Sequence, residues 1–411
     1  MSEGYLGLPA CQIFKAMIMD HIALSQVITG KVKEVLGSPD GVVALHEPEF
    51  LGDEEELIRD CVRSTFVSSA GKYVDRFEID IASACGAKFG VAVVNGTAAL
   101  EVALRVSGVQ PNDEVLMPSL TFIATANATH HLGAVPHFVD SEERTLGLDP
   151  NALRLHLNEI AEQRNGVTIN GRTGRRLKSV VPMHVFGHPV DMDALDVVAK
   201  DFGLTIVEDA AEALGSSLGG RLCGSLGRVA ALSFNGNKII TTGGGGAIVT
   251  SDPVLAERAK HLTTTAKVPH KWAFYHDEIG YNYRMPNLNA ALGVAQLAQL
   301  NAKLHQKRAL AKGYIDAFNG FNDTYIFSER ENTVANYWLN TLVLSREYSA
   351  ARETILSTLN EAGIMSRPVW EPMHTLKIYS DCPRSDLSVT EDLARRIINL
   401  PSSAKFGSQN K

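Results

Sequence analysis

The chain has 411 residues, 45% of them hydrophobic, and a formal net charge of −7 with acidic and basic residues interspersed. A chain of this length and composition can bury a large core, which excludes disordered and collagen-like proteins. Its charge does not favour a nucleic-acid partner, because phosphate backbones bind to clustered basic surfaces.

The cysteines and the N-terminus indicate the compartment. Five scattered cysteines, none spaced as C-x-x-C, predict neither a disulfide framework nor a metal site. No basic and apolar leader precedes a cleavage site, and no apolar run is long enough to span a bilayer. We therefore expect a soluble, cytoplasmic protein without a membrane partner. The cysteines are Cys11, Cys61, Cys85, Cys223 and Cys382.

The first predicted element is an N-terminal extension over residues 1–45. It contains a helix-like stretch, Ile13–Leu36, with apolar residues on more than one face. Such a helix is expected to pack on the body of the protein or on a partner subunit.

A large domain is expected over residues 46–302. Within it, short β-branched runs alternate with helix-like stretches, a pattern typical of crossover units that build a mostly parallel sheet. Helices are expected over Ala98–Val106 and Asp193–Phe202, with Asp191 capping the second. The predicted strands are short and apolar, as strands covered on both faces should be. They are Val91–Val94, Val115–Met117, Val135–Asp140, Ser179–Met183, Thr205–Glu208, Ala230–Phe234 and Ala247–Thr250.

The pattern changes beyond about Lys303. A helix is followed by a strand over Tyr337–Leu344, a helix over Ala351–Ala362 and extended chain over Met365–Trp370. We expect residues 303–411 to form a smaller α+β domain. After Ala404 only a polar tail is expected, so this domain is either incomplete or short.

In a doubly wound sheet, ligands bind outside the carboxyl ends of the strands. Asn95, Gly96 and Thr97 follow one predicted strand and begin a helix, where free amides and the helix dipole suit a phosphate group. A plain β–α turn can have the same sequence, so the motif alone does not establish a phosphate site.

Two other strand ends carry ionisable side chains. Asp209 and Glu212 follow Thr205–Glu208, although an acid in this position is usually a helix cap. Lys238 lies between a buried strand and an Ile-Ile, glycine-rich stretch, which is unusual for a surface lysine. Desolvation there would free its amine as a nucleophile.

An anion cradle, an acid and a lysine on neighbouring strands are the set that pyridoxal 5'-phosphate (PLP) requires. Asp209 would keep the pyridine nitrogen of the cofactor protonated by opposite charge. Lys238 would form the Schiff base and, once released, would carry the proton of a 1,3-shift. The residues therefore predict a PLP enzyme.

Three phrases, in this order, resemble the DegT/DnrJ/EryC1/StrS family of sugar aminotransferases, and the resemblance covers roughly Glu47 to Ala404. They are Glu208-Asp209-Ala-Ala-Glu212-Ala-Leu-Gly-Ser, Ser233-Phe-Asn-Gly-Asn-Lys238 and Gly280-Tyr-Asn282-Tyr-Arg284-Met. Longer phrases around His184 and over His276–Asn287 resemble the LegC branch, which is associated with 4-aminated UDP-sugars leading to bacillosamine or legionaminic acid. The resemblance implies an α/β fold of the fold-type-I PLP-dependent transferases, with a mostly parallel mixed sheet covered by helices.

The resemblance also implies roles for single residues. It places Phe122 against the ring face of the cofactor, although a core aromatic would fit the same position. His184 could touch the substrate or could equally be a satisfied core histidine. The remaining implied cofactor contacts are Gly96, Thr97 and Ser233 at the phosphate, Asp209 at the pyridine nitrogen and Lys238 at the aldehyde.

In this family the loop over His276–Asn287 crosses a dimer interface. We therefore expect a homodimer in which Asn282 and Arg284 reach the PLP phosphate or the substrate of the neighbouring chain. The alternative is a loop that closes over its own site or only packs as surface.

One residue departs from the family pattern. Glu212 stands where many members have a glutamine against the ring, which bears on the substrate that fits.

The function implied is transfer of an amino group from glutamate to a UDP-linked 4-keto-6-deoxy-2-acetamido sugar. The alternatives are a sugar 3-aminotransferase, a PLP sugar dehydratase, which would have histidine in place of Lys238, and a PLP-binding regulatory protein without catalysis.

Overall fold

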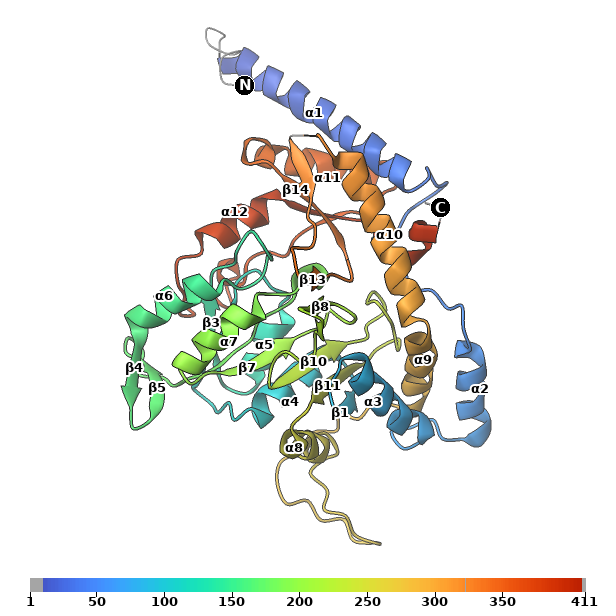
Figure 1. Ribbon diagram of the computed structural model, residues 1–411, viewed down its shortest axis with the longest axis vertical. Coiled ribbons are helices and arrows are strands. Elements are labelled where there is room, and N and C mark those ends of the chain that lie inside the picture. The colour runs from blue at the N-terminus through green and yellow to red at the C-terminus, as the bar shows by residue number, and fades with distance from the viewer. Residues whose placement is uncertain (1–9, 322, 409–411) are drawn as a thin grey trace.

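The computed structural model describes residues 10–321 and 323–408 of the chain. A seven-stranded sheet with the order β1-β11-β10-β7-β6-β2-β3 lies at its centre (Figure 1). All seven predicted strands are present, with ends shifted by no more than three residues. They are β1 (Phe89–Val93), β2 (Glu114–Pro118), β3 (Val135–Val139), β6 (Leu177–Val180), β7 (Thr205–Asp209), β10 (Val229–Ser233) and β11 (Gly246–Thr250).

The sheet is mixed and mostly parallel, as predicted. Neighbouring strands from β10 through β7, β6 and β2 to β3 are parallel, whereas β11 runs antiparallel to both β1 and β10. The carboxyl ends of β1, β7 and β10 therefore meet at one edge, where ligands are expected in such sheets.

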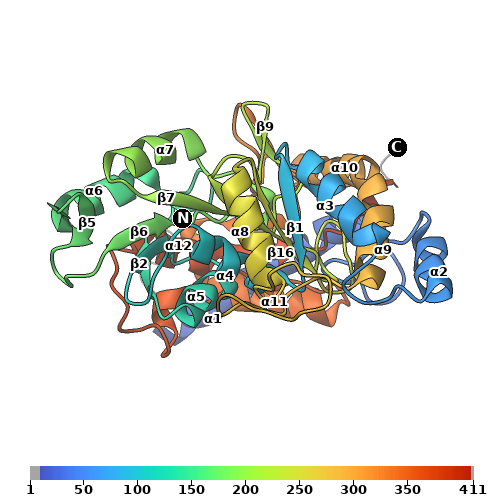
Figure 2. The ribbon, with the colours of Figure 1, turned by 90° about the horizontal axis from the view of Figure 1, so that it is seen from below.

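Helices cover both faces of the sheet, which explains why its strands are apolar on both sides. Figure 2 shows α6 and α7 on one side of β6 and β7, with α4 and α5 on the other. The side chain of Asp191 accepts a hydrogen bond from the Ala194 amide and caps α7, as predicted. The covering helices are α3 (Lys72–Ala84), α4 (Gly96–Val106), α5 (Ala124–His131), α6 (Pro150–Ile160), α7 (Met192–Asp201) and α8 (Pro253–Thr263).

The helix predicted in the N-terminal extension is observed as α1 (Ala10–Val35). Its buried face, which includes Leu24, Ile28 and Val32, packs against α10 (Leu300–Phe318) and α11 (Arg352–Glu361) of the same chain. α2 (Glu54–Ser64) follows and packs on α9 (Asn287–Ala298).

The C-terminal part contains an antiparallel sheet with the order β12-β14-β16-β15. The predicted strand at 337–344 begins later, at Asn340, because Tyr337 has a left-handed φ of 48°. A hydrophobic cluster joins Val343 of this part to Leu232 of the central sheet, so the division at residues 302 and 303 stays a prediction. The elements are β12 (Thr324–Ile326), β14 (Asn340–Leu344), β15 (Arg367–Pro368), β16 (Ile397–Leu400) and α12 (Ser388–Arg396).

The expectation that only a polar tail follows Ala404 is wrong. Ala404–Ser408 forms a 3-10 turn that packs on α10 and buries Phe406. A Cβ on Gly407 would overlap the carbonyl oxygen of Gln306, so the turn approaches the helix backbone closely.

Two small sheets complete the fold. β4 (Ala161–Arg164) and β5 (Val167–Asn170) form a hairpin, and β8 (Ser217–Leu218) pairs with both β9 (Arg221–Leu222) and β13 (Thr333–Val334). In the described part of the chain, every helix is too short or too polar to cross a membrane.

Candidate active site

A cavity of about 270 Å³ opens at the edge of the sheet where β1, β7 and β10 end. The structure brings most of the predicted site residues together in its wall. They are Gly96, Thr97, Phe122, Asp209, Glu212, Ser233 and Lys238.

The N-terminus of α4 forms one end of this cavity. Asn95 caps the helix by accepting a hydrogen bond from the Ala98 amide (2.8 Å). The amides of Gly96 and Thr97 open the helix, where no preceding turn supplies carbonyl partners and the dipole is positive. A Cβ on Gly96 would lie 2.8 Å from Cβ of Ser233, so glycine allows the serine hydroxyl to approach the helix end. This corner has the donors for a phosphate group.

Asp209 is the last residue of β7 and is only 2% exposed. It accepts hydrogen bonds from Oγ1 of Thr125 (2.7 Å) and from the Ala211 amide (3.2 Å). Burial raises the pKa of Asp209, while these hydrogen bonds and the charge of Lys238 act in the opposite direction. A cationic ring nitrogen at this carboxylate would offset the cost of burial and favour its ionised form.

Lys238 lies in the turn after β10, with its side chain 13% exposed. Its Nζ is 3.2 Å from Oε1 of Glu212 and 3.9 Å from the centroid of the Trp338 ring. The other oxygen of Glu212 accepts a hydrogen bond from the Phe186 amide (3.0 Å). Burial raises the pKa of Glu212 to about 7, against the lowering effect of Lys238 and of the Phe186 amide.

Aromatic side chains form the outer wall. Phe122 is 48% exposed and lies edge-on to Trp370, with 6.4 Å between ring centroids. Trp370 in turn packs on Phe186 at 5.0 Å. The sequence left two interpretations of Phe122, a cofactor contact and a core aromatic. Its exposure in the cavity fits the cofactor contact better.

His184 does not line this cavity. It is fully buried, its Nδ1 accepts from the Val190 amide (3.1 Å), and its Nε2 therefore donates to Glu208 (3.0 Å). Glu208 also accepts from the backbone amides of Gly224, Leu226 and Gly227. Both ring nitrogens are thus satisfied, so the structure corrects the expected substrate contact in favour of a core histidine.

Cys223 lies close to His184 and Glu208, in a group whose spacing could hold a metal ion. Burial raises the pKa of its thiol well above the usual value, which disfavours the thiolate that a metal needs.

Asn282 and Arg284 are also absent from the wall formed by their own chain. They lie at the base of the segment between α8 and α9, where Asn282 pairs with Thr264 and Arg284 pairs with Val93 of β1. The segment between α8 and α9 forms a loop that extends away from the body (Figure 1). Tyr281 and Tyr283 stack on each other at 4.8 Å against the core, so the alternating Asn282 and Arg284 face outward and are exposed.

Sequence reasoning missed several residues at the site. Thr125, which donates to Asp209, lies one turn after Phe122 in the same segment, and that spacing was an available signal. Trp338 and Trp370 come from the C-terminal part of the chain and had no local signal.

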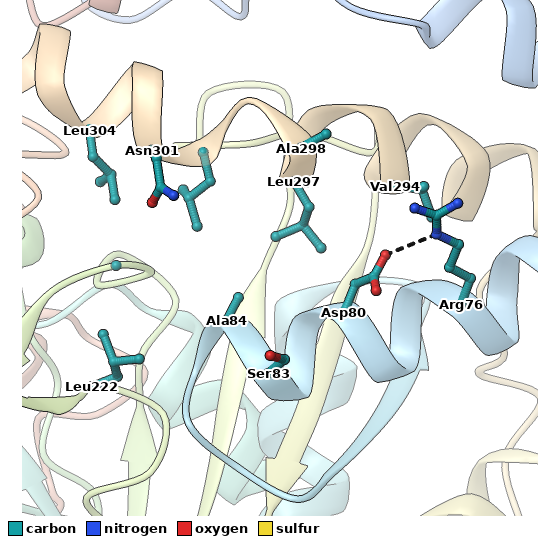
Figure 3. A pocket seen from close by; sticks show the side chains of 12 residues that line it. Arg76, Asp80, Ser83, Ala84, Leu222, Val294, Leu297, Ala298, Asn301 and Leu304 are labelled. Atoms are coloured by element: carbon teal, nitrogen blue, oxygen red, sulfur yellow. Dashed lines mark hydrogen bonds and ion pairs between the residues drawn. The ribbon is translucent and has the colours of Figure 1, made fainter.

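A second hollow, about 460 Å³ in volume, lies between α3 and the helices α9 and α10 (Figure 3). Its wall is mainly aliphatic, and Arg76 pairs there with Asp80 at 3.3 Å. Its lining residues include no lysine, so the smaller cavity is the better place for the predicted chemistry.

The fold and this cavity define a fold-type-I PLP enzyme, and comparisons with known proteins agree. A model of the DegT/DnrJ/EryC1/StrS aminotransferase family matches residues 50–410. The chain is 36% identical over 360 residues to the GDP-perosamine synthase of Escherichia coli O157:H7, covering 88% of this chain and 93% of the relative. It is 36% identical over 368 residues to the putative pyridoxal phosphate-dependent aminotransferase EpsN of Bacillus subtilis strain 168, covering 89% and 92%.

The solved structure of DesI in the presence of its TDP-sugar product has a TM-score of 0.78 at 27% identity, with 90% of this chain and 91% of that chain covered. The chain belongs to the DegT/DnrJ/EryC1/StrS aminotransferase family. It is therefore a PLP-dependent sugar aminotransferase of nucleotide-sugar biosynthesis, which confirms the family, fold type and cofactor expected from the sequence.

The donor set in the cavity fits PLP. Helix amides at Gly96 and Thr97 suit its phosphate, and the buried carboxylate of Asp209, which has no ion pair among the described residues, suits its ring nitrogen. The amine of Lys238 lies in the same wall and would bond to the aldehyde.

Proposed function

We propose that three groups bind the cofactor and move the proton: the N-terminus of α4 binds the phosphate, Asp209 binds the ring nitrogen, and Lys238 bonds to the aldehyde and transfers the proton. The observation that supports this is their convergence on one cavity from three separate strand ends. Gly96, Thr97 and Ser233 bind the phosphate, and Phe122 covers one face of the ring.

PLP, when bound, supplies an electron sink for the negative charge that forms as a substrate C–H bond breaks. Asp209 holds a proton on the ring nitrogen by opposite charge, which strengthens that sink. Nζ of Lys238, when it is free, would remove the proton from the substrate carbon that bears the nitrogen and deliver it to the carbon on the other side of that nitrogen, which completes the 1,3-shift. Glu212 lies 3.2 Å from this nitrogen and holds it in the wall of the cavity.

We further propose that the acceptor is a UDP-linked 4-keto-6-deoxy-2-acetamido sugar, as in bacillosamine and legionaminic acid synthesis, and that glutamate is the donor. The support is the resemblance to the LegC branch around His184 and over His276–Asn287. The aromatic wall of Phe122 and Trp370 suits the apolar face and methyl group of a deoxy sugar.

Amination of a panel of keto sugars tests this proposal. The purified protein is incubated with glutamate and UDP-, GDP- or dTDP-linked 4-keto and 3-keto sugars, and NMR identifies the carbon that gains nitrogen. We expect the fastest turnover at C4 of the UDP sugar, with Lys238→Ala as the blank. The names of the relatives make GDP and dTDP sugars the natural competitors, and a preference for either would overturn the nucleotide assignment.

The same panel separates the alternatives. Amination at C3 would make the protein a 3-aminotransferase. A protein that binds PLP but neither turns over any sugar nor changes its visible spectrum with glutamate would be a regulatory protein.

We also propose a homodimer with shared active sites, in which Asn282 and Arg284 serve the neighbouring chain. Both side chains face outward from their own chain. The loop that carries them exposes large apolar side chains, with Trp272, Phe274 and Ile279 all at least 78% exposed. Such a surface is typical of an interface, and here a second copy of the chain would cover it.

Subunit mixing tests the shared site. Lys238→Ala and Asn282→Ala proteins, each first shown to be nearly inactive, are combined under conditions that exchange subunits. In a shared arrangement one site of each heterodimer carries both defects and the other carries neither, so activity returns. Confirmed exchange without recovered activity would mean that each site uses only its own chain.

We also propose that the enzyme is located in the cytoplasm. Cys61, Cys85, Cys223 and Cys382 are all free thiols, as a reducing compartment favours. Fractionation of the source cells, with recovery of the activity in the cytosol or at the membrane, tests this location.

A further inference from the structure

A short segment from the C-terminal part of the chain, Asn336–Trp338, bridges the two loops that carry Glu212 and Lys238. Nδ2 of Asn336 donates to the backbone oxygens of Glu212 (2.8 Å) and Leu214 (3.0 Å). The indole Nε1 of Trp338 donates to the backbone oxygen of Asn237 (2.6 Å), directly before Lys238. One segment thus fixes both loops relative to each other.

The face of the Trp338 ring also contacts the amine itself. Nζ of Lys238 lies 3.9 Å from the ring centroid, in addition to its 3.2 Å contact with Oε1 of Glu212. Trp338 is buried, so little water screens this contact. An aromatic face attracts a cation, and the attraction grows when the pair is desolvated.

The backbone of this segment is held in a costly conformation. Tyr337 has φ of 48°, in the left-handed region that residues other than glycine rarely adopt. The amide of Trp338 donates to Oδ1 of Asn336 (2.8 Å), and its carbonyl accepts from the buried amine of Lys307 (3.1 Å). Strain of this kind persists only where the surroundings enforce it, and it is concentrated at functional positions.

We propose that Trp338 is a positioning residue for Lys238. Its ring face holds the ε-amine beside Glu212 in the cationic form, and its N–H fixes the turn from which Lys238 projects. Asp209, from the end of β7, and His46, from the segment before α2, also interact electrostatically with this amine.

Covalent attachment of PLP to the cofactor-stripped full chain provides a readout that does not depend on turnover. Attachment needs the neutral amine, because its nitrogen bonds to the aldehyde carbon while the aldehyde oxygen leaves as water. The rate is followed by visible absorbance from pH 6 to pH 10, about the range over which amines in proteins titrate. It yields a maximal rate and a pH midpoint.

Trp338→Phe and Trp338→Leu form the matched pair, since both lose the N–H but only phenylalanine keeps a ring face. Both should lower the maximal rate. Only the leucine variant should move the midpoint, by about half to one unit toward lower pH, because the cationic amine loses its aromatic partner.

An unmoved midpoint in the leucine variant, or an equal shift in the phenylalanine variant, would overturn the proposal. A maximal rate that stays at the wild-type value in both variants would do the same. Should the leucine variant not fold, as judged by circular dichroism, Trp338→Met replaces it, because methionine adapts to irregular gaps without offering a ring.

Discussion

Replacing Asp209 by asparagine removes one charge and leaves the shape of the side chain unchanged. The asparagine can keep both contacts of the carboxylate, accepting from the Ala211 amide and donating to Oγ1 of Thr125. We therefore expect Asp209→Asn to fold, to bind PLP and to keep the attachment at Lys238.

The expected loss follows from the burial of the site. Two opposite unit charges about 4 Å apart attract by about 4 kcal/mol at an effective dielectric constant of about 20. Asp209 is 2% exposed, so solvent ions screen this attraction little. If roughly two-thirds of it is realised only in the transition state, the barrier rises by about 2.7 kcal/mol and the rate falls on the order of 10²-fold.

The half-reaction with glutamate is the appropriate assay, since it needs no sugar substrate. Stopped-flow absorbance follows the loss of the visible band of the bound cofactor. Thr125→Val is the matched control, because it removes a hydrogen bond to Asp209 and keeps the charge, and it should cost no more than about tenfold. A folded, cofactor-bearing Asp209→Asn protein with the wild-type rate would refute the electrostatic role, and so would an equal loss in Thr125→Val.

Three further predictions concern the same cavity. Lys238→Ala and Lys238→Arg should both abolish turnover and the visible band of attached cofactor, since arginine keeps the charge but cannot form the Schiff base. If either variant kept half of the wild-type turnover, another residue would have to be the nucleophile. Because folded Glu212 keeps a proton up to about pH 7 that the unfolded chain releases near 4.5, the cofactor-free wild type should lose stability relative to Glu212→Gln as the pH rises from about 4.5 to about 7. Urea unfolding at several pH values measures this difference, and a constant difference would contradict it. Gly96→Ala places a Cβ 2.8 Å from Ser233 and should weaken PLP binding roughly tenfold or more in equilibrium titrations, whereas Gly236→Ala, whose Cβ meets nothing within 4 Å, should bind as the wild type does.

The central sheet was predictable because its signal is local. Each strand is a short apolar run that helices bury on both faces, and the polar residues that follow it mark the carboxyl end. Asp209, for example, directly ends β7, and its function follows from that position. Gly96 and Lys238 were found in the same way, each shortly after the end of a strand.

The C-terminal part was less predictable because neighbours in space decide its structure. β16 follows α12 without a glycine or proline between them, so its run Ile397–Leu400 carries no boundary signal and forms a strand by pairing with β14. His184 shows that neighbours in space also decide the role of a residue near the site. It follows a strand as Asp209 does, yet Glu208 and the Val190 amide satisfy both of its ring nitrogens away from the cavity.

Trp338 differs from the predicted site residues in a way that explains why sequence reasoning missed it. It precedes a strand of the second sheet, where no rule places ligands, and it contacts a backbone oxygen 101 residues away. Its place under Lys238 depends on the left-handed backbone of Tyr337, which no residue type in Asn336–Trp338 would suggest. Groups that take part in the chemistry lie where the sheet topology puts them, whereas groups that position them depend on tertiary contacts. Positioning residues in this fold must therefore be sought from the structure.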